Sequence, residues 1–260
     1  MRSRLLMLVV LFFAFSSRVM TAQRDQTLLV FAAASLTDAF EEIATAFEAE
    51  NPGVDVLFNF AGSSALATQL VEGAPADVFA SANTRQMRVA IEAGRIAEQP
   101  LVFARNWLVL ITPADNPANI ESLRDLANPG VKLVVAAPEV PVRVYTDVML
   151  ARLASVPTYG SAYRTAVLAN VVSEEDNVRQ VFLKVALGEA DAGIVYQSDV
   201  TPDAAVLTIP IPRVVNSLAT YPIAVTDDSQ NPELARAFVD FVLSDDGQSI
   251  LTRWGFLPVN

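Results

Sequence analysis

The chain of 260 residues contains no cysteine and no histidine. Without cysteine there is no disulfide, no thiolate nucleophile and no zinc site with sulfur ligands. Without histidine, the commonest general base and the commonest metal ligand are both missing. Catalytic triads and most transition-metal centres are therefore excluded. An enzyme would depend on carboxylates alone, and no D-x-D or E-x-x-E cluster stands at the end of a predicted strand.

Basic residues are also scarce, with 18 Lys and Arg against 29 Asp and Glu and a net charge of −11. A nucleic-acid partner is disfavoured, because phosphate contacts need clustered Lys and Arg. Arg2 and Arg4 precede an apolar run over 5–15, and small residues follow at 21–22, which is typical of a secretory signal peptide over 1–22. The run is too short for a membrane span. We expect an exported, periplasmic protein that is soluble after the leader is removed, when three arginines are lost and the net charge becomes −14.

From residue 27 onward, short apolar strands alternate with amphipathic helices, which predicts an α/β fold with mainly parallel sheets. The predicted strands cover 27–33, 54–60, 77–80, 107–111, 132–136, 192–196 and 221–225. The predicted helices cover 36–50, 63–72, 84–93, 120–127, 177–186 and 246–253, with two more beginning at Pro141 and Pro232. Two lobes, residues 23–104 with 225–260 and residues 105–224, would be joined by two crossing hinge strands around a cleft.

Two junctions in the first part of the chain run from a strand through serine into a helix. Ser35 follows the strand over 27–33, and with Asp38 it forms an S-x-x-D pattern that predicts a capping box. Ser63 and Ser64 follow the strand over 54–60 in the same way. Free N–H groups and the positive end of the dipole let a helix N-terminus hold an anion. Each serine taken alone is more simply a helix cap, but the pair predicts two N-termini converging on one small anion.

Six segments resemble the periplasmic molybdate-binding proteins of ABC importers, the ModA family, and the resemblance covers essentially the whole mature chain. They are 31–37 (FAAASLT), 60–64 (FAGSS), 73–82 (GAPADVFASA), 138–141 (PEVP), 175–178 (EDNV) and 193–199 (GIVYQSD). Each piece is short, but all six in the family's order are specific. The resemblance implies a two-lobed periplasmic-binding-protein (clamshell) fold and a protein that is not an enzyme. It would need no cofactor, bind molybdate or tungstate as a monomer, and deliver it to a membrane permease.

Carried over from the family, five positions would hold the tetrahedral oxyanion. They are the hydroxyl groups of Ser35, Ser63 and Tyr196 and the backbone N–H groups of Val142 and Val178. The sequence supports the two backbone positions independently. Val142 follows Pro141, and Val178 follows Asn177, which is predicted to cap its helix, so both stand where first-turn N–H groups are free. Tyr196 taken alone would more simply be a core residue at the end of an apolar strand.

Arg143 departs from the family pattern, which has a small residue at this position. We expect a salt bridge or a place at the cleft rim for it rather than a direct contact with the ligand. Asp77 and Asp199 are expected to serve turns or caps. A receptor for sulfate or thiosulfate remains the alternative, and phosphate is disfavoured because no position supplies a buried acceptor for its proton.

Overall fold

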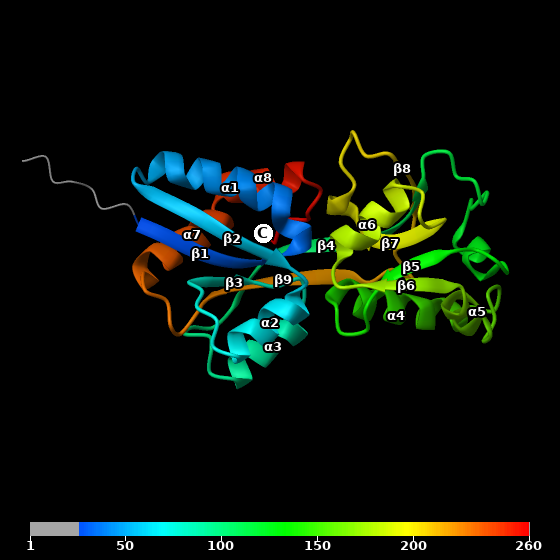
Figure 1. The fold of residues 1–260 in the computed structure, drawn as a ribbon, viewed down its shortest axis with the longest axis horizontal. Helices are drawn as coiled ribbons and strands as arrows, with labels where there is room; N and C mark the ends of the chain where they lie inside the picture. The colour runs from blue at the N-terminus through cyan, green and yellow to red at the C-terminus, as the bar shows by residue number, and fades with distance from the viewer. Residues whose placement is uncertain (1–25, 260) are drawn as a thin grey trace, which may run out of the picture.

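The computed structural model describes residues 26–259, so the predicted signal peptide over 1–22 lies outside the described part. Two α/β lobes lie side by side along the long axis (Figure 1). Within the described part, no helix is long and apolar enough to cross a membrane.

Lobe 1 is built on three parallel strands at the N-terminal end of the chain. These are β1 (Gln26–Ala33), β2 (Val54–Ala61) and β3 (Val78–Ala80), in the order β2-β1-β3. Five helices cover this sheet, with one group on each face (Figure 1). On one face lie α1 (Thr37–Glu50), α7 (Pro232–Leu243) and α8 (Asp245–Arg253); on the other lie α2 (Ser63–Val71) and α3 (Thr84–Glu92).

Lobe 2 repeats this plan with the middle of the chain. Its strands are β5 (Leu133–Ala136), β6 (Val171–Glu175) and β7 (Ala192–Tyr196), with β5 parallel to both neighbours. Its helices are α4 (Pro141–Ala154) and α5 (Tyr163–Ala169) below the sheet in Figure 1 and α6 (Val178–Ala186) above it. Short 3-10 helices complete the connections: η1 (Ala34–Leu36) in lobe 1, and η2 (Leu123–Ala127) and η3 (Gln197–Asp199) in lobe 2.

Two long strands join the lobes, β4 (Leu101–Pro113) and β9 (Leu218–Val225). β4 pairs with β9 over its first half and with β7 and β8 (Val206–Pro210) over its second half. Each antiparallel pairing between named strands involves β4 or β9, whereas β1 with β2 and β3, and β5 with β6 and β7, pair in parallel. The predicted two-lobed α/β clamshell with crossing strands is confirmed. The helix predicted over 120–127 is wrong in type and length, because a short 3-10 helix stands there.

The core of lobe 1 explains why α1 lies where it does. Phe40, Ile43 and Phe47 recur at helical spacing and are all buried. Phe238 of α7 packs against Phe40 and Phe47 with ring centroids 6.1 and 5.4 Å away, both nearly edge-on. This aromatic contact locks α1 and α7 onto the same face of the sheet.

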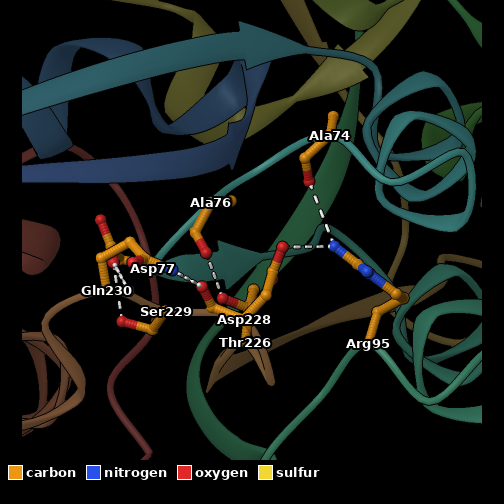
Figure 2. Close-up of polar contacts among 8 residues, drawn as sticks. All are labelled: Ala74, Ala76, Asp77, Arg95, Thr226, Asp228, Ser229 and Gln230. Atoms are coloured by element: carbon orange, nitrogen blue, oxygen red, sulfur yellow. Dashed lines mark hydrogen bonds and ion pairs between the residues drawn. The ribbon is translucent and has the colours of Figure 1, made fainter.

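The buried carboxylate of Asp77 connects three segments of lobe 1, and Figure 2 shows its contacts with Ser229 and Gln230. One oxygen accepts from the backbone N–H of Leu29 in β1 at 2.8 Å. The other accepts from the Ser229 hydroxyl at 2.7 Å and the Gln230 N–H at 3.1 Å, in the loop between β9 and α7. An ion pair between Arg95 and Asp228, at 2.6 Å, fixes the same loop from the side. The expected local turn or cap role of Asp77 is therefore wrong: its carboxylate holds the returning C-terminal segment against the first strand.

We predict that Asp77→Ala lowers the free energy of unfolding by about 2–4 kcal/mol, because it leaves buried donors from two segments without their charged acceptor. The control is Asp227→Ala, which removes an exposed carboxylate from the same loop and should cost less than about 0.5 kcal/mol. Urea unfolding of both variants measures the difference. Equal losses would contradict the role of Asp77.

Candidate functional site

Four helical starts, two from each lobe, meet around one small cavity between the lobes. It encloses about 210 Å³ including its mouth. The enclosed part is much smaller than this space, so the cavity suits a small ion and not a drug-sized molecule. It is lined by Ala33, Ala34, Ser35, Gly62, Ser63, Ala82, Val140, Pro141, Val142, Asn177, Val178 and Tyr196. All five predicted site residues are in this set.

Ser35 lies in η1, directly after β1, and it is buried. The predicted capping box is wrong, because the Ser35 hydroxyl makes no cap hydrogen bond. Instead it shares a hydrogen bond of 3.1 Å with the hydroxyl of Tyr221. Asp38, the other half of the predicted box, forms an ion pair with Arg179 of lobe 2. A 3-10 turn therefore comes before α1, and it leaves the serine facing the cavity.

Ser63 is the first residue of α2 and follows β2 through Gly62. Its hydroxyl oxygen accepts a hydrogen bond from the backbone N–H of Ala82 at 3.0 Å. The Ser63 oxygen accepts this bond through one of its lone pairs, so the hydroxyl proton remains available for another acceptor. Ser64, the neighbouring candidate, lines the wider mouth of the cleft and not the cavity.

Lobe 2 contributes two helix N-termini. Val142 is the second residue of α4 after Pro141, and Val178 is the first residue of α6. The side chain of Asn177 caps α6 by accepting from Gln180 N–H at 3.1 Å, as the sequence predicts. N–H groups in a first turn have no partner within their own helix, so both valines present donors to the cavity.

Tyr196 ends β7 and is fully buried, yet its hydroxyl has no hydrogen-bond partner among the described residues. Burial raises the pKa of this phenol well above its ordinary value, and the nearby hydroxyl of Tyr221 adds to the effect. Tyr196 is therefore a neutral donor. An unpartnered polar group in such a position is costly unless a ligand pairs with it.

The two lobes are in contact around the cavity. A Cβ atom on Gly62 would lie 2.3 Å from the backbone oxygen of Asp176, so only glycine allows this approach. On one side Arg179 of α6 pairs with Asp38 of α1 at 2.6 Å. On the other side the Gln86 amide donates to the backbone oxygen of Glu139 at 2.9 Å. The structure thus presents the clamshell closed.

Arg143 points away from the cavity. Its guanidinium pairs with Glu174 at 2.6 Å and with Asp147 at 3.3 Å, and it also donates to the backbone oxygen of Ala136. The expected salt bridge is confirmed. The large side chain leaves the start of α4 intact, because these contacts hold it within lobe 2.

A second buried carboxylate, Asp199, stands next to the site. One of its oxygens accepts from the backbone N–H of Tyr196 at 2.9 Å, which confirms the expected cap role. Burial raises the pKa of Asp199 to about 7, against the opposing effects of that N–H group and of the Arg179 charge. Among the described residues, no group of three or more acidic side chains is arranged to hold a metal ion.

Comparison with known proteins identifies the family to which this chain belongs. The family model for bacterial extracellular solute-binding proteins matches residues 28–257. The molybdate-binding protein ModA of Mycobacterium tuberculosis is 43% identical over 247 residues, which cover 93% of this chain and 88% of that protein. The chain belongs to the ModA family of bacterial extracellular solute-binding proteins.

Solved structures share the fold of this ModA-family chain. The periplasmic molybdate-binding protein of Azotobacter vinelandii matches with a TM-score of 0.76 and 20% identity over 90% of this chain and all of that one. The sulfate-binding protein SubI of Mycobacterium tuberculosis matches with a TM-score of 0.80 and 19% identity, over 90% and 88% of the two chains. The fold by itself therefore leaves the oxyanion undetermined.

Sequence reasoning missed two contacts behind the serines of this family member. Tyr221 appears in the sequence only as part of an apolar strand, and Ala82 acts through its backbone. Neither contact could be predicted from a local sequence pattern, because Tyr221 is far from Ser35 along the chain and Ala82 contacts Ser63 from a separate loop.

We predict that Asp199 makes the free energy of unfolding fall as the pH rises from about 4 to about 7. Its pKa is higher in the folded protein than in the unfolded chain, so the folded state binds the proton more tightly over that range. Its stabilising effect is complete below the unfolded pKa and is lost above the folded one. Asp199→Asn keeps an acceptor for Tyr196 N–H and should remove this component. Parallel pH profiles of unfolding for wild type and Asp199→Asn would show that the carboxyl group does not titrate this way.

Proposed function

We propose that this protein is the extracytoplasmic receptor of an ABC importer and that it captures molybdate or tungstate between its lobes. The observation that carries the proposal is the convergence of five donors from both lobes on one ion-sized cavity: Ser35, Ser63, Val142, Val178 and Tyr196. The relative named as a molybdate-binding protein, at 43% identity, supports the choice of ligand.

The proposed site attracts a dianion without a charged ligand residue. All five donors are neutral, and the chain carries a net charge of −11. Short hydrogen bonds and helix N-termini inside a desolvated cavity therefore supply the attraction. An anion held this way satisfies N–H and O–H groups that burial would otherwise leave unpaired.

The same donors give selectivity. A fully deprotonated tetrahedral dianion accepts from every donor, whereas a protonated oxyanion brings an O–H group that finds no acceptor in the proposed set. Sulfate is a smaller tetrahedron and cannot reach all donors at about 2.8 Å. We therefore favour molybdate and tungstate, with sulfate or thiosulfate as the alternative that the shared fold keeps open.

The wider role follows from the family. We propose a periplasmic, monomeric binding protein, without a cofactor and without catalytic activity, that delivers its oxyanion to a membrane permease. The lobes, residues 23–104 with 225–260 and residues 105–224, would open and close about β4 and β9. In such receptors, ligand contacts to both lobes favour the closed form.

Isothermal titration of the mature protein tests the ligand. We predict that molybdate and tungstate bind about equally, that sulfate binds at least about a hundredfold more weakly, and that phosphate hardly binds near neutral pH, since each missed donor costs about 1–3 kcal/mol. Sulfate binding as tight as molybdate binding would favour the alternative receptor. Recovery of chemically altered ligand would contradict a pure binding protein.

Neighbouring serines provide a matched control for this titration. Ser63→Ala removes a donor from the cavity and should weaken molybdate binding about tenfold or more. Ser64→Ala changes the next residue, which lies outside the cavity, and should leave the dissociation constant within about twofold.

The ion pair between Asp38 and Arg179 links the lobes, so its loss should disfavour closure. We predict that Arg179→Gln and Asp38→Asn each weaken molybdate binding about two- to fivefold, since partly exposed pairs contribute about 0.2–1 kcal/mol. The two variants change the net charge in opposite directions. If long-range charge were responsible, titration would show affinity falling for Arg179→Gln and rising for Asp38→Asn.

A further inference from the structure

Tyr145, in α4 of lobe 2, does not line the cavity but contacts the supports of several proposed donors. It comes one helical turn after Val142, whose N–H group faces the cavity. Its ring packs edge-on against the ring of Tyr196, with the centroids 6.4 Å apart. Its hydroxyl reaches the backbone oxygen of Ala82 in lobe 1 at 3.5 Å, and the N–H group of Ala82 donates to Ser63. One side chain outside the cavity therefore connects donors of both lobes.

The two hydrogen bonds of the Tyr145 hydroxyl have directions that the chemistry of the partners fixes. The backbone N–H of Thr220, in the crossing strand β9, can only donate, and it lies 3.2 Å from the phenol oxygen. The backbone oxygen of Ala82 can only accept, so the phenol donates to it. Burial raises the pKa of Tyr145, so the phenol keeps its proton at neutral pH. Tyr145 is therefore a neutral link from β9 to the connection between β3 and α3.

The length of the bond to Ala82 indicates what this link does. Hydrogen bonds between two oxygens are usually about 2.7–2.8 Å long, and this one is 3.5 Å. At that length it attracts the lobes only weakly. The phenol oxygen nevertheless occupies the space between α4 and Ala82, and the N–H group of Thr220 holds it there. Tyr145 thus limits how closely lobe 2 approaches the segment that supports Ser63.

The spacing between the lobes determines which anion can accept from both. The N–H group of Val142 and the hydroxyl of Tyr196 lie on one side of the cavity, and the Ser63 hydroxyl lies on the other. Hydrogen bonds weaken when the donor and acceptor are held apart, so a smaller tetrahedron needs a closer approach of the lobes. A spacer between the lobes therefore disfavours the smaller anion.

We propose that Tyr145 is a specificity-determining residue that acts as a spacer between the lobes and sets the size of the tetrahedral anion that the cavity accepts. The proposal rests on the oxyanion-binding function proposed above. Its role is one of positioning, because Tyr145 acts on the ligand only through the groups that it holds apart.

The test is Tyr145→Phe, which keeps the ring against Tyr196 and removes the hydroxyl, titrated with molybdate and with sulfate. Molybdate binding should weaken about two- to fivefold, because the donors of the two lobes are held less firmly. Sulfate binding should hold or improve, because lobe 2 can then approach Ala82 more closely. The dissociation constant of sulfate divided by that of molybdate should fall at least about threefold.

Urea unfolding of the same variant separates positioning from stability. Tyr145→Phe leaves the N–H group of Thr220 without its acceptor, so the free energy of unfolding should fall. A merely structural role would change this stability and leave the ratio of dissociation constants as in the wild type. That result would overturn the proposal.

Gln86 provides a matched control, because its amide also joins the lobes by donating to the backbone oxygen of Glu139 at 2.9 Å. Gln86→Met removes this bond, keeps the length of the side chain and leaves Tyr145 in place. Both anions should bind more weakly by a similar factor, with their ratio within about twofold of the wild type. A fall in the ratio as large as in Tyr145→Phe would show that losing any contact between the lobes relaxes selectivity, and would overturn the proposal.

A longer side chain should have the opposite effect. O-methyltyrosine at position 145 keeps an oxygen that accepts from Thr220 N–H, and its methyl group extends toward Ala82. Sulfate binding should then weaken more than molybdate binding, and the ratio should rise at least about threefold. This variant keeps the acceptor for Thr220 and so tests the proposal even if Tyr145→Phe fails to fold. An unchanged or lower ratio would overturn it.

The wild-type titrations distinguish the two levels of inference. If the wild type prefers sulfate to molybdate, the proposed ligand is wrong, and the same ratio still tests Tyr145, since the shorter side chain should favour sulfate and the longer one molybdate. If the wild type prefers molybdate and neither variant changes the ratio, only the proposal for Tyr145 fails. If it binds neither anion, both proposals fail before any variant is made.

Discussion

Unpaired backbone N–H groups at the starts of helices are the constraint around which this molecule is organised. Every α-helix begins with donors that its own backbone cannot satisfy, and burial makes them costly. Here the starts of α2, α4 and α6, together with the 3-10 turn before α1, are buried at one place. In the proposed function, a tetrahedral dianion in the cavity would accept hydrogen bonds from these donors. In the proposed function, folding and ligand binding therefore respond to the same electrostatic requirement.

The sheet topology brings these starts together. In each lobe the strands that lead into the site are parallel, so their carboxyl ends lie at the same edge. β4 and β9 carry the chain between the lobes and turn those two edges toward each other (Figure 1). Contacts such as Arg179 with Asp38 then hold the lobes together around the cavity. The same topology thus places part of the cavity lining in each lobe and lets the two lobes meet around it.

Two of the residues that line the cavity have hydrogen-bond partners behind it. The ModA-family chain shares its fold with a sulfate-binding protein, so the fold does not choose the ligand. Behind the site, the backbone N–H of Ala82 donates to the hydroxyl oxygen of Ser63, and the hydroxyl of Tyr221 shares a hydrogen bond with that of Ser35. Burial raises the pKa of Tyr196 and of Tyr221 well above the ordinary value, so both stay protonated. The same effect raises the pKa of Asp199 to about 7.

The sequence by itself determined the α/β class, the strand-to-helix junctions at Ser35 and Ser63, and the cap of α6 by Asn177, because these depend on local periodicity and on neighbouring residues. It also indicated the salt-bridged state of Arg143, whose charge could not be buried unpaired. It predicted a capping box at Ser35 and Asp38 that the structure does not contain, because the S-x-x-D pattern also fits a serine in a 3-10 turn before a helix. Only the tertiary structure decided that Asp38 pairs with Arg179, 141 residues away, and that Tyr221 reaches Ser35 across 186 residues. Contacts at such separations depend on how β4 and β9 cross between the lobes, and no local pattern in the chain encodes that geometry.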